Sequence, residues 1–349
     1  QKLGNPYITL IERMVLFMME LGKEFLYLSK KEVASLGMPP REMVALLENA
    51  FLEKSAGRYQ MPPKIAIHPY HEEPDDYIHA MPCCIDSLKV AGLKWVSGYN
   101  KNMIKHQLPF INGLLILNDP GTGLPLCVMD CVWITAKRTG AVSGMSAKHL
   151  ARKGAETIGI IGCGVQGRSN LEAIAANVPG IKRAYAYDLF KDSCQKYASD
   201  MQNQLGFEVI PCEDIKEAVI HADILITSGP TLANEYSFRI QPDWLKPGVL
   251  ITSVDADFQF SMEAIESIDK FTTDDQGQFK VFRGNGAIHS VPGIPVEIGE
   301  ILAGKEPGRI DDDQKIFACN IGLSLCDMAV ANAIYQNAIE KNIGTVLPL

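Results

Sequence analysis

The sequence predicts an α/β protein, with a doubly wound parallel sheet in its second part and an α+β domain in its first. Its 349 residues are 47% hydrophobic, which is enough chain and apolar surface for two domains. From residue 157 onward, short apolar runs alternate with helical segments, a rhythm typical of a parallel sheet with helices on both faces. Between residues 59 and 126, short runs separated by Pro, Gly and Asn predict an antiparallel meander.

The predicted first domain comprises residues 1–135, and a C-terminal segment at residues 311–349 returns to it. Apolar residues at helical spacing predict helices over residues 1–24 and 41–55, and one long helix from 311 to 341. Ser29 is a candidate cap for a helix that follows a short strand. The strands of this domain are expected at residues 25–28, 64–68, 77–81, 91–96, 113–118 and 124–129.

The predicted second domain comprises residues 136–310 and contains the doubly wound sheet. Two crossings of the chain between the domains predict a cleft, the place where open α/β sheets bind ligands. Helices are expected at residues 135–150, 166–176, 192–205 and 214–221. Strands are expected at residues 157–162, 183–187, 208–212, 224–228, 249–254 and 270–273.

Charge and cysteine usage exclude several classes of protein. The formal net charge of -8 argues against a nucleic-acid or anionic-membrane surface, because either requires a basic patch. No apolar run approaches the roughly 18 residues of a membrane span. The nine cysteines lack zinc-type spacing, so no metal site is predicted. Residues 1–4 show no signal-peptide pattern, and reduced thiols in a cytoplasmic protein are expected.

The sharpest local signal is the glycine loop, Gly162-Cys163-Gly164-Val165-Gln166-Gly167, which follows an apolar strand and opens a helix. In that context Gly162 permits a tight turn, Gly164 lets the backbone approach a pyrophosphate, and Gly167 lets helix and strand pack closely. The amides at the helix N-terminus then face the phosphates. The loop predicts a Rossmann-type dinucleotide site, and a glycine turn without a ligand is the alternative.

Asp188 follows the strand at 183–187 and comes 21 residues after Gly167. A carboxylate there accepts hydrogen bonds from a ribose hydroxyl and repels a 2′-phosphate, so NAD(H) is favoured over NADP(H). Two alternatives stay open. Asp188 can be an ordinary cap at the end of a strand, and Lys191 or Arg168 can accommodate a phosphate.

Four residues are candidates for chemistry on a small amino or keto acid. Arg138 is a natural bidentate clamp for a carboxylate, and Lys64 is a further candidate on the strength of its sequence context. Lys94 lies between apolar neighbours, where partial burial lowers the pKa of a lysine and fits it for proton transfer. Asp257, at the end of a strand, is placed to hold or activate an amine, an iminium or water.

Each of these four residues also has a structural interpretation. Lys64 and Lys94 can be surface lysines whose stems cover apolar neighbours. Arg138 can be a helix-surface or phosphate-contacting arginine. Asp255 is the rival of Asp257, because alternation along a strand would put both carboxylates on one face.

Together these stretches resemble the ornithine cyclodeaminase/mu-crystallin family, from about residue 26 to residue 344. The order and spacing of several motifs carry the resemblance. They are Met61-Pro62-Pro63-Lys64, the Gly-x-Lys-x-Val of residues 92–96, Thr135-Ala136-Lys137-Arg138-Thr139, the glycine loop, Asp223-Ile224 with Thr227-Ser228, Ala256-Asp257, and residues 300–309.

The resemblance implies a homodimer whose N-terminal domain binds substrate and dimerises, and whose Rossmann domain binds NAD(P). It implies that Lys64, Lys94 and Arg138 hold the substrate carboxylate and that Asp257 is catalytic. The expected cofactor contacts are Thr139, Gly162, Gly164, Val165, Gln166, Gly167, Asp188, Thr227, Ser228 and Asn320.

Two departures from the family bear on the substrate. Where the cyclodeaminases show Glu-x-Met-Pro, this chain has His79-Ala80-Met81-Pro82, and His79 and Met81 are expected to contact the substrate. After Asp257, the family's Pro-Gly-Lys is replaced, and Phe258-Gln259-Phe260-Ser261 follows instead. Both departures argue against ornithine. A core or surface histidine is the alternative for His79.

The expected activity is that of an NAD(H)-dependent amino-acid dehydrogenase or imine (ketimine) reductase, acting on a small 2-imino acid or on a 2-oxo acid plus an amine. Lys94 serves as acid/base, and Asp257 stabilises the iminium or positions water. An ornithine cyclodeaminase, a lyase, is the first alternative, but it must recognise a second amine, for which His79 is a poorer partner than Glu. A mu-crystallin-like binding protein is the second, and the presence of Lys64, Lys94, Arg138 and Asp257 argues against it.

Overall fold

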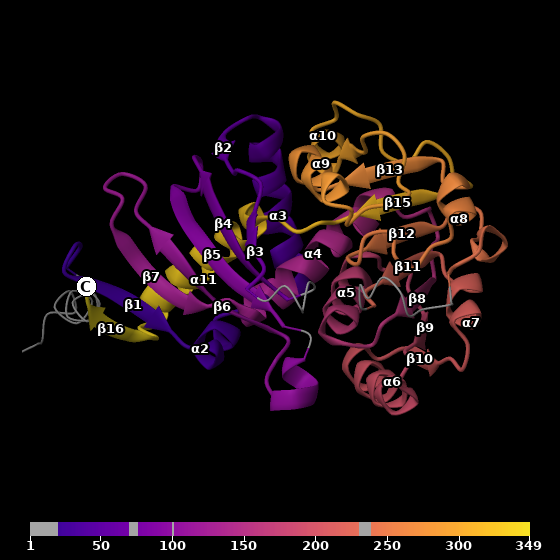
Figure 1. Ribbon diagram of the computed structural model, residues 1–349, viewed down its shortest axis with the longest axis horizontal. Coiled ribbons are helices and arrows are strands. Elements are labelled where there is room, and N and C mark those ends of the chain that lie inside the picture. Colours follow the sequence, from indigo (N-terminus) through magenta and orange to yellow (C-terminus); the bar gives the residue numbers. More distant parts are fainter. Residues whose placement is uncertain (1–19, 70–75, 100, 230–238) are drawn as a thin grey trace, which may run out of the picture. The chain divides into compact units, whose positions relative to one another are not determined.

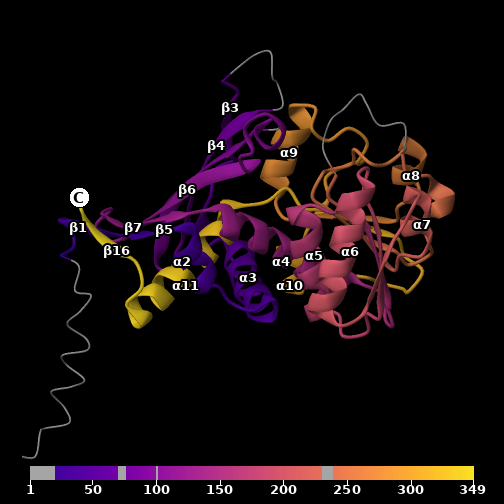
Figure 2. The same ribbon diagram turned by 90° about the horizontal axis from the view of Figure 1, so that it is seen from below.

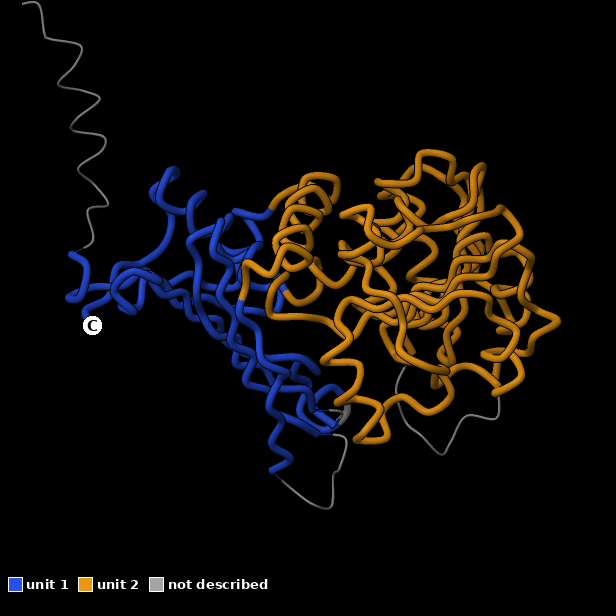
Figure 3. The backbone as a smooth tube through the Cα atoms, turned by 90° about the horizontal axis from the view of Figure 1, so that it is seen from above, with its two compact units in different colours: residues 1–37, 60–134, 327–349 blue, residues 38–59, 135–326 orange. Residues whose placement is uncertain are grey.

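The computed structural model describes residues 20–69, 76–99, 101–229 and 239–349 (Figure 1). The chain divides into two compact units, coloured separately in Figure 3. Unit 1 comprises residues 1–37, 60–134 and 327–349, and unit 2 comprises residues 38–59 and 135–326. Within the described ranges, no helix has the length and hydropathy needed to cross a bilayer.

Unit 1 is built on a mixed sheet with the strand order β16-β1-β7-β6-β5-β4-β2, and β3 pairs with β4 (Figure 1). Strands β4 to β7 pair antiparallel in chain order, which confirms the predicted meander. Strand β1 adds parallel to β7, and β16 adds antiparallel to β1. The strands are β1 (Glu24–Leu28), β2 (Tyr59–Gln60), β3 (Ile65–Ile67), β4 (Tyr77–Ile85), β5 (Val90–Gly98), β6 (Ile111–Asn118), β7 (Pro125–Asp130) and β16 (Thr345–Pro348).

The two faces of this sheet differ, because successive side chains along a strand point to opposite sides. One face is covered by α11 (Ser324–Lys341), which lies so close to β5 that a Cβ on Gly92 would come within 2.7 Å of Met328 Sδ (Figure 2). The opposite face leaves Trp95 of β5 and Leu114 of β6 each 45% exposed. Helix α2 (Lys30–Ser35) begins at a capping box formed by Ser29, as predicted, and η2 (Asn102–His106) is a short π-helix.

Unit 2 contains a parallel sheet with the strand order β10-β9-β8-β11-β12-β15-β13-β14 (Figure 1). The chain starts at β8, adds strands outward on one side, and then returns to add β11 and β12 on the other, which confirms the doubly wound arrangement. The strands are β8 (Thr157–Ile161), β9 (Arg183–Tyr187), β10 (Glu208–Pro211), β11 (Ile224–Thr227), β12 (Leu250–Ser253), β13 (Lys270–Thr273), β14 (Val296–Glu297) and β15 (Ile316–Cys319). The helices are α3 (Pro40–Ser55), α4 (Val132–Leu150), α5 (Val165–Asn177), α6 (Lys191–Leu205), α7 (Ile215–Ile220), η3 (Pro242–Trp244), α8 (Met262–Glu266), α9 (Gln276–Gly284) and α10 (Ile298–Leu302).

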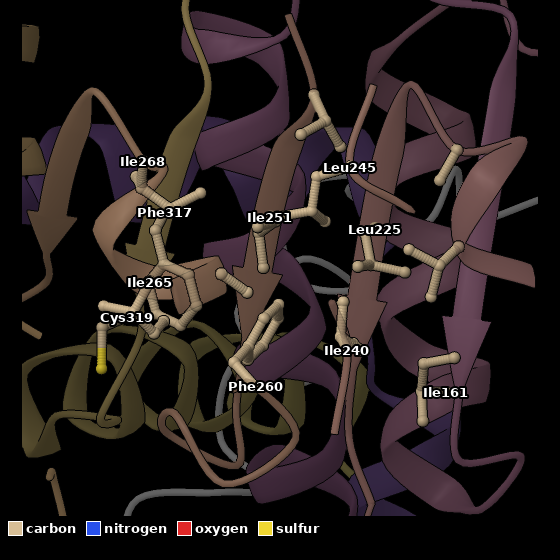
Figure 4. Packing of buried hydrophobic residues seen from close by; sticks show 14 of the residues in the cluster. Ile161, Leu225, Ile240, Leu245, Ile251, Phe260, Ile265, Ile268, Phe317 and Cys319 are labelled. Atoms are coloured by element: carbon tan, nitrogen blue, oxygen red, sulfur yellow. The ribbon is translucent and has the colours of Figure 1, made fainter. Parts of the chain in front are cut away.

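A buried apolar cluster covers one face of the unit 2 sheet (Figure 4). Leu225 of β11, Ile251 of β12 and Phe317 of β15 project from the central strands into this layer. The rings of Phe260 and Phe317 meet edge to face, with centroids 5.2 Å apart. The cluster fixes the central strands, and the loops at their carboxyl ends are therefore held in place.

The predicted helix over residues 311–341 is wrong in its first half. Residues Ile316–Cys319 form β15, a central strand between β12 and β13, and the helix begins only at Ser324. All four residues of β15 are buried. A short apolar run buried on both faces has no periodicity that separates a strand from a helix.

The unit boundaries also differ from the predicted domain boundaries, which placed residues 41–55 in the first domain. Helix α3 belongs to unit 2, where it packs against α5 and α10. Lys54 near its end forms buried ion pairs with Asp275, at 3.0 Å, and with Glu297. The helix predicted over residues 1–24 lies largely outside the described residues, which begin at Glu20.

Candidate active site

Two glycines of the glycine loop are required by the packing of unit 2 itself. Gly162 has φ +95°, and a Cβ there would lie 2.5 Å from the carbonyl oxygen of Ser228. A Cβ at Gly167 would collide with the carbonyl oxygen of Gly162, so its absence lets α5 approach β8. These positions therefore have the roles in turn and packing that the motif predicts.

Gly164 has no such structural requirement. A Cβ at this position would meet no atom within 4 Å, and Gly164 has φ −77°, which any residue adopts. It is the N-cap of α5 and supplies no side-chain acceptor, and Val165 beside it is 64% exposed. The start of α5 therefore has no side-chain cap, and the space beside Gly164 is open. A phosphate group provides the acceptor and the negative charge that such a helix end attracts, so the loop fits a dinucleotide pyrophosphate.

Asp188 follows β9 directly, and its carboxylate is bonded to the glycine loop. Oδ2 accepts a hydrogen bond from the amide of Cys163 at 2.8 Å, and Oδ1 accepts one from the amide of Phe190 at 2.9 Å. A carboxylate has about four acceptor sites, so Asp188 retains capacity for ribose hydroxyls. The residue is thus held in the position where a Rossmann domain reads the adenosine ribose.

The two cations proposed as alternative partners of a 2′-phosphate already have acidic partners. Lys191 pairs with Glu213, and Arg168 Nη2 lies 3.0 Å from Asp200 Oδ2. Exposed pairs of this kind are weak, so they do not by themselves prevent phosphate binding.

Thr227 and Ser228, both expected at the cofactor, are tied into the loops that surround the glycine turn. Ser228 Oγ donates to the carbonyl oxygen of Gly162 at 3.0 Å. Thr227 Oγ1 donates to Asp255 at 2.6 Å, and the amide of Gly229 donates to the same carboxylate at 2.8 Å. Burial raises the pKa of Asp255 to about 6 in spite of these hydrogen bonds. The structure thus brings Thr227 and Ser228 together with the glycine loop.

Thr139 and Gln166, two further expected cofactor contacts, lie where α4 and α5 touch. A Cβ on Gly140 would come within 3.0 Å of the amide of Asn170, so the two helices are in close contact. Thr139 Oγ1 donates to the carbonyl oxygen of Thr135 at 2.7 Å, so its hydroxyl is hydrogen-bonded within α4. Gln166, in the first turn of α5, is half-buried.

Asp255 and Asp257 do not share one face of a strand, so that expectation was wrong. Strand β12 ends at Ser253, and Ala256 between the two carboxylates has φ +57°, which breaks the extended alternation. Asp257 accepts hydrogen bonds from the backbone amides of residues 289–291, including His289 at 2.9 Å. Both carboxylates are 3% exposed. They are therefore fixed by different partners, although only one residue separates them.

Arg138 of α4 is 6% exposed and lies against the loop that follows β15. A Cβ on Gly322 would come within 2.7 Å of Arg138 Nη1. Asp274 holds this loop, because its oxygens accept from the amides of Ile321 at 3.1 Å and Gly322 at 2.6 Å. In the same loop Asn320 has a buried Nδ2 without a hydrogen-bond partner among the described residues. A buried unpaired donor is costly, so Asn320 is suited to donate to a bound molecule.

His79 lies on β4 of unit 1, and its ring stacks on Tyr77 with centroids 4.2 Å apart. Burial, together with the nearby charges of Lys64, Lys94 and His68, lowers the pKa of His79 to about 3. His79 is therefore neutral at physiological pH. The structure brings together Lys64, His79 and Lys94, three of the expected substrate contacts.

Lys94 of β5 is buried, and it has an acidic neighbour that the sequence did not indicate. Its Nζ lies 2.6 Å from Oδ2 of Asp327 on α11, and the two side chains are 1% and 0% exposed. Met81, another expected substrate contact, is the cross-strand neighbour of Lys94 and is 4% exposed. Breaking a buried pair by removing one partner costs about 3–5 kcal/mol, because it leaves a buried charge unpaired.

Residues 25–342 match the ornithine cyclodeaminase/mu-crystallin family. The chain belongs to this family. It is 34% identical to the alanine dehydrogenase of Archaeoglobus fulgidus, across 92% of this chain and 98% of the relative.

Two solved structures from this family share the fold of the chain. A Δ1-pyrroline-2-carboxylate reductase of Thermococcus litoralis, in complex with NADH and L-proline, has a TM-score of 0.81 and 31% identity, across 92% of this chain and 99% of that one. An archaeal alanine dehydrogenase dimer with bound NAD has a TM-score of 0.82 and 32% identity, across 93% of this chain and 99% of that one. These structures confirm a Rossmann-type α/β domain accompanied by a second domain.

Sequence reasoning missed Asp327 and Asp274, which support two of the residues it had found. Asp327 is the only acidic residue in the stretch from Leu323 to Ala338, and a lone carboxylate in an apolar helix is itself a signal. Asp274 precedes Asp275 after a short strand, and this sequence context resembles an ordinary helix cap. Only the fold shows that Asp274 binds the loop beside Arg138.

Proposed function

We propose that this protein is an NAD(H)-dependent amino-acid dehydrogenase or imine reductase that acts on a small 2-imino acid, or on a 2-oxo acid plus an amine. The observation that carries the proposal is the likeness, over nearly the whole chain, to a reductase that holds NADH and L-proline. The uncapped amides of α5 beside Gly164 support it, since they suit a pyrophosphate.

In this proposal unit 2 holds the cofactor. Thr139, Thr227 and Ser228 accompany the glycine loop, and Asp188 binds the adenosine ribose. Asn320 at the end of β15 offers its unpaired Nδ2 to the nicotinamide half, since strands on that side of the sheet serve the second nucleotide. When bound, NADH supplies the hydride that reduces the C=N carbon.

The substrate groups have separate tasks. Lys64 and Arg138 bind the α-carboxylate as cations. Lys94, held beside Asp327, carries the proton that completes imine reduction. Asp257, fixed by the amides of residues 289–291, stabilises the positive charge of the iminium or positions water.

The environment of His79 favours net reduction over ornithine cyclodeamination. A cyclodeaminase must recognise a second ammonium group on its substrate. His79 is neutral, and the nearby charges of Lys64 and Lys94 that lower its pKa would repel that ammonium. Met81, the buried cross-strand neighbour of Lys94, adds an apolar side chain here. The side chain of the substrate is therefore expected to be uncharged or acidic.

NAD(H) is the proposed cofactor rather than NADP(H), because Asp188 would repel a 2′-phosphate. Replacing this carboxylate in Asp188→Ser should narrow the preference for NADH about tenfold or more, which corresponds to about 1.4 kcal/mol. The preference is measured as the ratio of kcat/KM for NADH and NADPH. The exposed Asp192 of α6 is the control, since Asp192→Ser should leave that ratio unchanged.

A homodimer is proposed, formed through the exposed face of the unit 1 sheet. Ile65, Ala80, Trp95 and Leu114 are successive cross-strand partners on β3 to β6, so their side chains share that face. Ile65 is 63% exposed and Trp95 45%. An exposed apolar face of this kind is typical of a subunit interface.

A cytoplasmic location is inferred from the nine cysteines, all of which are free thiols.

The test of the proposed function follows NADH absorbance with purified protein and a panel of acceptors. The panel contains pyruvate, glyoxylate, oxaloacetate and 2-oxoglutarate, each with ammonia or methylamine, and cyclic 2-imino acids. Steady NADH consumption with at least one acceptor is expected. If none reacts, and ornithine with catalytic NAD releases ammonia instead, the protein is a lyase and the proposal is wrong.

A further inference from the structure

A buried carboxylate interrupts the most apolar helix of unit 1. Cys326, Met328, Ala329 and Val330 around Asp327 are all at most 1% exposed, and Asp327 itself is 0% exposed. A carboxylate at such a position is strongly destabilising unless a partner compensates it. Lys94 Nζ, 2.6 Å from Asp327 Oδ2, is a partner of opposite charge.

The close approach of α11 to β5 is what allows the pair to form. Gly92 and Lys94 are two residues apart on β5 and therefore point to the same face of the sheet. Because Gly92 has no side chain, Met328 packs directly against the strand, where a Cβ would come within 2.7 Å of its Sδ. Asp327, adjacent to Met328, is thereby brought to Lys94.

We propose that Asp327 is a positioning residue: it keeps the ammonium of Lys94 charged and fixed in place, so that Lys94 can donate the proton in the reaction. This inference rests on the proposed function and adds a residue that does not itself touch the substrate. Lys94 is embedded among β4, β5 and α11, so without a counter-charge it would lose its proton at lower pH. Among the described residues, the charges that act on His79 in this cluster are those of Lys94 itself, Lys64 before β3 and His68 after it.

A purely structural ion pair makes a different prediction. In that case Asp327 serves only to satisfy Lys94, or the first turn of α11, where acidic residues are favourable. Its loss would then lower stability without altering the proton-transfer step. Activity per folded molecule and its dependence on pH would remain those of the unaltered protein.

The experiment compares Asp327→Asn, Asp327→Glu and the unaltered protein in pH profiles of kcat/KM for imine reduction. Asp327→Asn should lower kcat/KM about 10- to 100-fold and move the basic limb of the profile to lower pH, because general acid catalysis is lost when Lys94 deprotonates. Asp327→Glu, which keeps a carboxylate, should restore part of kcat/KM and part of the position of the basic limb. In a Lys94→Met background, Asp327→Asn should have little further effect on kcat/KM, because the two residues act as one unit.

A matched control is the buried pair of Lys54 and Asp275 in unit 2, whose atoms are 3.0 Å apart. Asp275→Asn should lower Tm, because a buried cation loses a partner, but it should leave the pH profile unchanged. Asn remains a good N-cap for α9, which Asp275 begins. A basic limb that stays in place in Asp327→Asn, with Tm lowered as in the control, would overturn the positioning role.

A spectroscopic readout separates this inference from the proposed function. The 13Cε resonance of Lys94, assigned by its absence in Lys94→Met, is followed against pH without any substrate. It should titrate at lower pH in Asp327→Asn than in the unaltered protein. If it does so while no imine is reduced, the proposed function fails and the pairing stands. If the two titrations coincide, Asp327 does not control the charge of Lys94, whatever the activity.

Discussion

At the scale of single residues, Asp255 and Asp257 show how little sequence spacing says about environment. The left-handed conformation of Ala256 turns the chain between them. Asp255 is then enclosed by Thr227 and the amide of Gly229, and Asp257 is enclosed by the amides of residues 289–291. Deciding which of the two carboxylates is the catalytic candidate depends on this arrangement, and the alternation of side chains along a strand cannot predict it.

Asp257→Asn should lower turnover about 100-fold or more, because a charged group that stabilises an iminium or orients water is lost. NADH affinity should change little, as measured by fluorescence titration. Tm should also fall, since the new amide places an NH2 group against backbone donors. Asp255→Asn is the comparison, and its turnover should fall less. Undiminished turnover in Asp257→Asn would rule out its catalytic role.

The residues missed from sequence were those whose partners are distant in the chain. Lys94 and Asp327 are separated in the chain by β6, β7 and residues 135–326 of unit 2, so neither residue suggests the other. Arg138 and the loop at Gly322 are likewise joined only by folding. In contrast, the glycine loop and Asp188 could be predicted, because the turn, the helix end and the strand end lie within one βαβ unit.

At the scale of helices and strands, the start of α5 carries the clearest cofactor prediction. Gly164→Ala should leave Tm nearly unchanged, because a Cβ there meets no protein atom, but it should weaken NADH binding about tenfold or more. The control is Gly284→Ala on α9, a second position where a Cβ meets no atom within 4 Å. Binding is measured by NADH fluorescence. Equal affinity in the two variants would mean that no phosphate approaches Gly164.

Strand β4 carries a prediction about acid stability through His79. Its pKa is about 3 in the folded protein against 6.5 in a model peptide, so between these values the unfolded chain binds a proton that the folded chain does not. This group therefore lowers stability as pH falls from about 6.5. Between pH 7 and pH 5, the Tm of His79→Gln should therefore fall less than the Tm of the unaltered protein. The exposed His106→Gln is the control, and an equal Tm loss in His79→Gln and the unaltered protein would contradict the buried, neutral ring.

Elements were predictable where periodicity or punctuation was strong, and not where strands were short and buried. Strands β9 and β13 have the predicted bounds, since Gly, Pro or charged residues flank them. Strand β15 was taken as helix because its four apolar residues fit either pattern. Strand β16 follows a helix directly at the end of the chain, and only its pairing with β1 identifies it.

At the scale of the whole molecule, the exposed face of the unit 1 sheet predicts dimerisation. Trp95→Glu would bury a charge in the proposed interface, which is strongly unfavourable, so the protein should become a monomer of 38.3 kDa. Sedimentation analysis measures the mass. Met262→Glu, at a 60% exposed apolar residue of unit 2, should leave the dimer intact. A dimer that persists in Trp95→Glu would place the interface elsewhere.

The most direct measurement of imine reduction is the fate of a labelled hydride. The protein is incubated with NADH in which both hydrogens at C4 of the nicotinamide are deuterium, together with the best acceptor found, and the amino-acid product is examined by mass spectrometry and NMR. One deuterium at the α-carbon, in amounts equal to the NADH oxidised, is the predicted result. Two results would contradict net reduction. One is a product without the label. The other is the absence of labelled product while α-deuterated ornithine, tested in parallel, is converted to a product that keeps its deuterium.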